Sequence, residues 1–272
     1  MTGTVGPRSR RGRRAPLFVV LVASVAVALF ALPLIGLLQR TPWSDLWSDL
    51  SSEQARDALR LSLLCSIWAT GLSIVLGVPL AWLLARVDFV GRPLVRALVL
   101  LPMVVPPVVG GVALLFAFGR SGLVGEQLHD WFGIQFTFNT AGAVLAETFV
   151  AMPFLVITVE AGLRSIDTRY EDAAATLGAG RWTTFRRVTL PFLAPSLVAG
   201  AALAWARALG EFGATITFAG NIQGRTQTMP LAVFLELQSD PERAIALSLV
   251  LIAVSIVVLV SLRDRWLPSA AS

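Results

Sequence analysis

Charged side chains inside long apolar stretches are the residues of this sequence best placed to do chemistry. Arg207 and Glu211 are four residues apart in one such stretch, so a helix presents both on one face, where they can pair. A charge at the centre of a bilayer costs about 2.5–3.5 kcal/mol on insertion scales, so both side chains are expected to face other helices or a water-filled path. Two interpretations stay open: Arg207 lies beside the path of an anion, or the pair joins helices internally, which we favour.

A second candidate lies in the apolar stretch from Ala97 to Gly119, which contains Pro102, Pro106 and Pro107. Each proline removes a backbone donor and tends to bend a helix. A bent helix can line or gate a pathway, and Pro106 and Pro107 are our candidates for that role. The alternative is a kink that only aids packing.

The sequence lacks the residue sets that catalysis or metal binding needs. Cys65 is the single cysteine and His129 the single histidine, which excludes a zinc site or a Cys/His nucleophile pair within one chain. The apolar stretches contain no aspartate for a paired-aspartate protease. The chain also has no lysine, and hence no Gly-x-x-x-x-Gly-Lys phosphate loop. We therefore predict that it is not an enzyme and holds no cofactor, and that another polypeptide must hydrolyse any ATP.

The composition is that of a membrane protein. The chain is 56% hydrophobic and 14% charged, whereas a soluble domain carries about 25% charged residues. The net charge is +5, and all 22 basic residues are arginines in short loops between apolar runs, apart from Arg207. Those loops have few aromatic residues that could stack on bases, so we exclude nucleic-acid binding.

Six apolar stretches are long enough to cross about 30 Å of hydrocarbon as helices, the only open-chain structure that satisfies its backbone in lipid. They cover residues 15–39, 61–85, 97–119, 141–163, 192–218 and 244–262. The first is longer than the 7–15 apolar residues typical of a signal peptide, so we expect a retained helix. Glu147 and Glu160 fall near the ends of the fourth stretch, where burial costs less, and we assign them no transport role. The predicted fold is an all-α polytopic membrane protein with six transmembrane helices.

The arginines between these stretches predict the orientation. If the N-terminus is cytoplasmic, residues 1–14, 86–97, 164–191 and 263–272 are cytoplasmic and hold 15 arginines, against six in the outer loops. The positive-inside rule therefore places both termini in the cytoplasm of a multi-pass cell-membrane protein. The tail over residues 1–14 is expected to be disordered.

The cytoplasmic segment 164–191 has the pattern of a rigid peg rather than a tether. Thr168-Arg169-Tyr170-Glu171 matches a Thr-x-x-Glu capping box, which starts a short helix of small alanines. Gly178 is placed to end that helix in the left-handed conformation, and a second short helix, closed by Pro191, follows. A helix this short is marginal in water alone, so we expect it to sit in a groove of another protein.

This segment resembles the cytoplasmic coupling loop of ATP-binding-cassette (ABC) importer permeases. The family pattern is Glu-Ala-Ala, three residues, Gly, nine residues and Ile-x-Leu-Pro. The matching residues here are Asp172-Ala173-Ala174, Gly178 and Val188-Thr189-Leu190-Pro191. Asp172 replaces the family's glutamate and Val188 its isoleucine, and Glu171 is the alternative acid for meeting the partner.

Two further motifs are similar to the molybdate branch of these permeases. They are Leu101-Pro102-Met103-Val104-Val105-Pro106-Pro107-Val108-Val109-Gly110-Gly111 and the run from Ala206 to Phe218, which continues into Gly220-Asn221-Ile222 and Thr226-Gln227-Thr228-Met229-Pro230. Sulfate permeases carry a related Gly-Glu-Phe-Gly-Ala run. The resemblance covers residues 57–262, an ABC-transporter type-1 transmembrane domain with its coupling loop at 164–191.

The resemblance implies a permease subunit that forms the translocation pathway for molybdate, with tungstate as a second candidate. It implies a homodimer in membrane lipid, two cytoplasmic ATPase subunits that bind ATP and Mg²⁺, and an external molybdate-binding protein. The implied ATPase-coupling residues are Glu171, Asp172, Ala173, Ala174, Gly178, Leu190 and Pro191. The alternatives are a sulfate or thiosulfate permease and, from another class, an ion-coupled secondary transporter.

Overall fold

The computed structural model describes residues 16–266, without the side chains of residue 259 and residues 261–266. The chain divides into two units, Met1–Pro42 and Trp43–Ser272, which are described separately. In the first unit, α1 (Leu17–Gln39) is one apolar helix without a buried residue. This matches the helix expected over residues 15–39. The predicted disordered tail over residues 1–14 lies outside the described residues, as do residues 267–272 of the predicted C-terminal tail.

The second unit is helical throughout its regular structure, and the described residues contain no strand. Its elements are α2 (Leu46–Leu50), α3 (Glu53–Arg86), α4 (Arg92–Val104), α5 (Pro107–Phe118), α6 (Gly125–Phe132), α7 (Thr140–Ser165), α8 (Arg169–Thr176), α9 (Arg181–Thr184), the π-helical segment η1 (Phe185–Thr189), α10 (Leu190–Leu209), α11 (Gly213–Phe218), α12 (Met229–Ser239) and α13 (Pro241–Trp266). The prediction of an all-α fold is confirmed.

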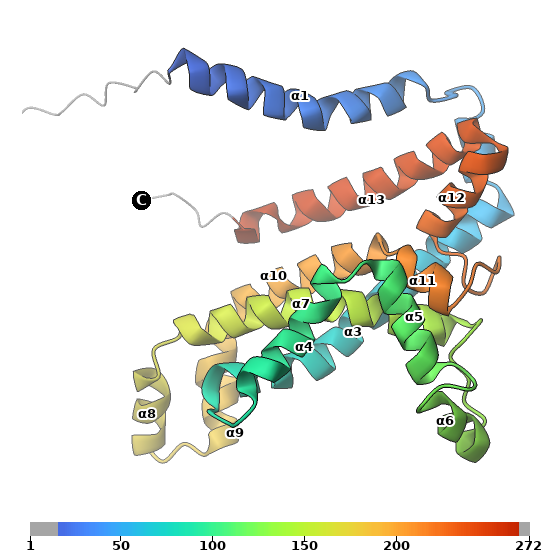
Figure 1. Ribbon diagram of the computed structural model, residues 1–272. Coiled ribbons are helices and arrows are strands. Elements are labelled where there is room, and N and C mark those ends of the chain that lie inside the picture. The colour runs from blue at the N-terminus through green and yellow to red at the C-terminus, as the bar shows by residue number, and fades with distance from the viewer. Residues whose placement is uncertain (1–15, 267–272) are drawn as a thin grey trace, which may run out of the picture. The chain divides into compact units, whose positions relative to one another are not determined.

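The core of this unit is the packing of α3, α7 and α10, which lie side by side in Figure 1. Their contact surface combines leucine with alanine and glycine, small residues that let helix backbones approach closely in a membrane. Gly162 on α7 shows how close the approach is. A Cβ atom added there would lie 2.5 Å from the Cβ of Ser196 on α10.

The expected third span, residues 97–119, is divided into two helices. The described part of the chain has five helices long and apolar enough to cross a membrane, and α4 and α5 share the remaining stretch. Val105 and Pro106 separate them with extended ψ angles of 134°. Helical geometry is disfavoured for a residue before a proline, and both Val105 and Pro106 precede one, so the Pro106-Pro107 pair produces a break where we predicted a bend.

The expected fifth span, residues 192–218, differs at both ends. Its helix begins at Arg181 and runs through η1 into α10, so the prediction that Pro191 closes a separate short helix is wrong. At the end of the π-helical segment, the Leu190 amide donates to the carbonyl of Phe185, five residues earlier. Hydrogen bonding is therefore already altered just before Pro191, which has no N–H to donate. At the other end, the helix stops at Leu209, and α11 starts only at Gly213.

The helix order places the loops of this unit at two ends of the α3–α7–α10 core. Figure 1 shows α8 and α9 at the end where α3 and α7 finish and α4 starts. It shows α5, α6, α11 and α12 at the other end. The peg predicted from residues 164–191 and the two helix breaks therefore occupy different parts of the same unit.

The close α7–α10 packing predicts that Gly162→Ala lowers the thermal stability of the detergent-solubilised protein. Overpacking of this kind costs about 1–3 kcal/mol, because a backbone or a short side chain must move. Gly71→Ala on α3 is the matched control, since a Cβ atom there meets nothing within 4 Å. Equal melting temperatures for the two variants would contradict the packing described.

Candidate coupling loop and pathway site

The start of α8 is held differently from the expected capping box. Thr168 has helical angles, φ −62° and ψ −20°, and its side chain caps nothing. A capping side chain needs an extended backbone at its own residue, so the Thr168–Glu171 capping box is wrong. Asp167 instead satisfies an amide at the start of α8, because its Oδ1 accepts a hydrogen bond from the Arg169 amide at 3.0 Å.

The end of α8 agrees with the sequence. Gly178 has φ +83°, the left-handed conformation predicted for it. The Gly178 amide donates to the Ala175 carbonyl at 2.9 Å, and the Ala179 amide donates to the Ala174 carbonyl at 3.0 Å. This pair of bonds is the Schellman motif, which satisfies the last carbonyls of a helix and fixes the direction of the chain beyond it.

The structure separates the two neighbouring acids of the loop. Glu171 is half-buried, and its Oε1 accepts hydrogen bonds from Arg86 at 3.3 Å and from the Thr189 hydroxyl at 2.9 Å. It therefore ties α8 to the end of α3 and to η1. Asp172 is exposed, and its carboxylate makes no hydrogen bond or ion pair within the described residues. Asp172 is the acid left free for a partner.

The loop that carries Asp172 exposes apolar side chains as well as arginines. No residue of α8 is buried, Ala173 is exposed and Ala174 is half-buried. Leu177 is 89% exposed and Trp182 is 72% exposed. Small residues that permit close backbone approach, next to large exposed apolar side chains, are typical of a protein-interaction surface. Of the remaining predicted coupling residues, Leu190 is half-buried and Pro191 is exposed at the start of α10.

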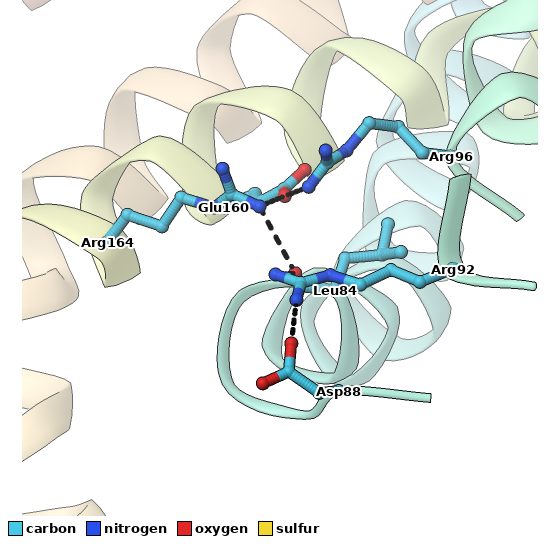
Figure 2. Close-up of polar contacts among 6 residues, drawn as sticks. All are labelled: Leu84, Asp88, Arg92, Arg96, Glu160 and Arg164. Atoms are coloured by element: carbon cyan, nitrogen blue, oxygen red, sulfur yellow. Dashed lines mark hydrogen bonds and ion pairs between the residues drawn. The ribbon is translucent and has the colours of Figure 1, made fainter. Parts of the chain in front are cut away.

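Beside this loop, sequence reasoning missed a group of arginines bound to Glu160, drawn in Figure 2. The Glu160 carboxylate on α7 accepts from Arg96 on α4 and pairs with Arg164 at 2.8 Å. The Arg164 pairing has the i, i+4 spacing of a helix, which was visible in the sequence. The Arg96 contact spans 64 residues and left no such signal.

At the other end of the unit, the Arg207–Glu211 pair is formed. Arg207 on α10 makes an ion pair with Glu211, whose side chain is 1% exposed. The Oε1 of Glu211 also accepts a hydrogen bond from the Ala214 amide at 2.8 Å. Glu211 thereby satisfies a free amide at the start of α11, while Arg207 lies in the last turn of α10. Both charges suit the partial charges of these helix ends, and the pair bridges the break between them.

The two broken spans are in contact where α5 packs against α11, and glycines allow the close approach. A Cβ atom on Gly213 would lie 2.9 Å from Pro107, and one on Gly111 would lie 2.7 Å from Thr217. α5 and α11 therefore pack with little between their backbones. Pro107 is half-buried at this contact, whereas Pro106, in the break itself, is exposed.

Glu147 and Glu160 are both buried although they lie near the ends of α7, with exposed fractions of 1% and 8%. The Oε2 of Glu147 has no hydrogen-bond partner among the described residues. Within the described part of the chain, no group of three His, Cys, Asp or Glu side chains could hold a metal ion.

Helices long enough to span a membrane, two of the spans broken, and an exposed short helix at one end describe an all-α polytopic membrane protein. A family model described as "Binding-protein-dependent transport system inner membrane component" matches residues 73–270. The chain belongs to this family of inner-membrane transport components. That assignment agrees with the prediction of a multi-pass membrane permease that is not itself an enzyme.

Three curated relatives are similar to this chain over most of its length. The chain is 46% identical over 252 residues to the Mycobacterium tuberculosis molybdenum transport system permease protein ModB, covering 92% of this chain and 94% of the relative. It is 44% identical over 211 residues to ModB of Escherichia coli K12, covering 78% and 92%. It is 38% identical over 247 residues to the sulfate transport system permease protein CysT of the same organism, covering 90% and 87%.

Solved structures share the fold. A chain of a bacterial ABC transporter involved in the import of the acidic polysaccharide alginate aligns with a TM-score of 0.71 at 23% identity, covering 93% of this chain and 96% of that one. A chain of the MetNI methionine ABC transporter aligns with a TM-score of 0.60 at 19% identity, covering 77% and 95%.

The left-handed Gly178 predicts that Gly178→Val leaves the protein inserted in the membrane but stops transport. Left-handed geometry costs a residue with a side chain about 1–2 kcal/mol, and the end of α8 must change to avoid it. Gly178→Asn should retain more uptake into membrane vesicles, because asparagine tolerates this geometry.

Gly180→Ala is the control, since Gly180 has φ −67° and open space around its Cα atom. Normal uptake by Gly178→Val would count against a fixed α8.

The Arg207–Glu211 pair predicts that Arg207→Ala lowers stability by about 3 kcal/mol, because it leaves the buried carboxylate without its counter-charge. The double variant Arg207→Ala, Glu211→Gln should regain stability, since the amide oxygen can still accept from Ala214. Thermal unfolding in detergent and vesicle uptake should be measured together.

A stable double variant that transports normally would assign the pair to joining α10 and α11. A stable double variant that does not transport would assign Arg207 to the anion path. A double variant no more stable than Arg207→Ala would contradict the pairing argument.

Proposed function

We propose that this chain is the permease subunit of an ATP-driven importer of molybdate, with tungstate as a second substrate of the same shape and charge. The observation that carries the proposal is the identity of 44–46% to molybdenum permeases from two distant bacteria, against 38% to a sulfate permease. The coverage of these alignments supports a shared function for the whole transmembrane domain rather than for a common motif alone.

Two of these permeases, in our proposal, form a homodimer that binds two cytoplasmic ATPase subunits through α8. The exposed Asp172 and Ala173 and the half-buried Ala174 form the contact surface, and Gly178, Leu190 and Pro191 hold its shape. Arginines of the ATPase are the expected partners of Asp172, because a guanidinium matches a carboxylate in charge and geometry. ATP and Mg²⁺ bind to the ATPase subunits, and Glu171 fixes α8 against the membrane helices.

The orientation in this proposal puts α8 and both termini in the cytoplasm, as the distribution of arginines favours. The other end of the unit then faces outward and receives the anion from an external binding protein. The family description names transport systems that depend on such a protein.

The broken spans are the proposed path. A dianion cannot enter hydrocarbon unpaired, so it needs a wet route that opens to one side at a time. The breaks at Pro106 and at Gly210–Phe212 lie on adjoining helices, and irregular backbone is tolerated at membrane depth where it is buried in protein or lines a cavity. We place Pro106, Pro107, Arg207 and Glu211 at this path, with Glu211 fixing the break and Arg207 supplying a positive charge.

The alternative with a specific observation behind it is sulfate or thiosulfate transport, since the sulfate permease is also similar over 90% of the chain. An ion-coupled secondary transporter is disfavoured by the family assignment and by α8, which such a transporter does not need.

Reconstitution in proteoliposomes tests the function. The permease is combined with its partner ATPase and external binding protein, and uptake of labelled molybdate and sulfate is compared with and without internal ATP. We expect ATP-dependent molybdate uptake that exceeds sulfate uptake and resists an ionophore. Preference for sulfate would assign the chain to the alternative, and uptake that an ionophore abolishes would refute ATP drive.

A further inference from the structure

Glu160 is a buried carboxylate in a helix that packs against its neighbours mainly through apolar residues. It lies on α7, near the end of the helix that meets the coupling loop, and is 8% exposed. Its Oε1 accepts from Arg96 of α4 and pairs with Arg164 of its own helix at 2.8 Å. Figure 2 shows both guanidinium groups directed at this carboxylate. Because one of them comes from α4, Glu160 joins two helices rather than stabilising one.

One of these arginines, Arg164, also binds the end of α3, together with Arg92. The Leu84 carbonyl is one of the last four of that helix, which lack intrahelical partners. It accepts from Arg92, the first residue of α4, at 2.6 Å and from Arg164 of α7 at 3.4 Å. Arg164 therefore contacts both Glu160 and Leu84. Through these contacts, the end of α3, the start of α4 and the end of α7 form one polar cluster (Figure 2).

This cluster continues to the coupling helix. Arg86, two residues after Leu84, pairs with Glu171 of α8 at 3.3 Å, and Glu171 in turn accepts from Thr189. The side chain of Arg86 is 14% exposed, so solvent screens this pair less than it screens a surface pair. The contacts from α8 and those from α4 and α7 therefore meet on the last turn of α3, at Arg86 and at the Leu84 carbonyl two residues earlier.

α4 is the element that this series can move. It is the first half of the broken span and ends at the Val105–Pro106 break, so it is not continuous with α5. Val95 and Val99, both partly buried, pack against the core cluster, and Pro102 is the one buried residue of α4. Arg92 and Arg96 supply its polar attachment at the loop end. A helix fixed at one end by charges and released at the other by a break can tilt as a rigid piece.

We propose that Glu160 is a positioning residue that makes α4 follow the coupling helix, so that ATP hydrolysis is converted into movement of the broken span. This inference rests on the proposed function and assigns to Glu160 a role in that function. Without the Glu160–Arg96 contact, α8 still binds the ATPase through its own surface, but α4 no longer follows it. ATP is then hydrolysed without import.

The test is the amount of ATP hydrolysed per anion imported, measured in proteoliposomes of the complete complex. Glu160→Gln removes the charge and keeps the volume. Asp88→Asn is the matched control, because Asp88 pairs with Arg92 in the same cluster but its side chain is 98% exposed. We expect Glu160→Gln to raise the ratio about tenfold, the scale of the charge lost from a hydrogen-bonded ion pair whose amide replacement can still accept, with unchanged binding of the ATPase subunits. Asp88→Asn should keep the wild-type ratio.

Arg96 supplies a second, independent variant. Arg96→Gln should raise the ratio as Glu160→Gln does, and the double variant should be no worse than either alone, because both remove one contact. Arg96→Lys keeps the charge and should recover part of the coupling. If the complex with Glu160→Gln fails to assemble, the variants Arg96→Gln and Arg96→Lys provide the test, because the Arg96 side chain is 36% exposed.

The ratio separates this inference from the proposed function. A wild-type complex that imports sulfate rather than molybdate overturns the substrate, and the ratio measured with sulfate still tests Glu160. Wild-type coupling in both Glu160→Gln and Arg96→Gln would overturn the inference. So would hydrolysis and import that fall in equal proportion, because that result marks a merely structural residue.

Discussion

The membrane interior offers no water to a free backbone amide or carbonyl, and the helix interruptions in this chain meet that constraint in identifiable ways. Glu211 accepts from the Ala214 amide where α10 gives way to α11. A π-helical segment places altered hydrogen bonding before Pro191. Arginines of α4 and α7 satisfy the Leu84 carbonyl where α3 ends. The charged side chains of this apolar protein are therefore concentrated where its helices stop, and those are also the places where a transport subunit must change shape.

In our proposal, two neighbouring acids of the loop have different roles: Asp172 contacts the ATPase and Glu171 attaches α8 to the membrane helices. Asp172 stands at the family's glutamate position and is exposed, while Glu171 is held by Arg86 and Thr189. The proposed coupling requires both acids, because a surface transmits motion only if it binds the partner and is fixed to what must move. The left-handed Gly178 completes the attachment by setting the path of the chain toward α9.

Features set by local sequence could be predicted, and features set by distant partners could not. The left-handed Gly178 and the Arg207–Glu211 pair depend on residues within one or two helical turns, and both are present. The Arg86–Glu171 and Arg96–Glu160 contacts join residues 85 and 64 positions apart, which no periodicity reveals. The capping box failed for a local reason, since the pattern of side chains does not determine whether the backbone of Thr168 is extended or helical.

The most direct test of the account is a crosslink from α8 to a nucleotide-binding chain. Ala173→Cys in a Cys65→Ser background introduces one exposed thiol, because Cys65 is the single native cysteine and is buried. Ser121→Cys, in the loop after α5, is the control at the other end of the unit. We predict that a short bifunctional reagent joins position 173, and not position 121, to the ATPase in intact cells. An ATPase crosslink at position 121, or accessibility of position 173 to impermeant thiol reagents added outside, would contradict it.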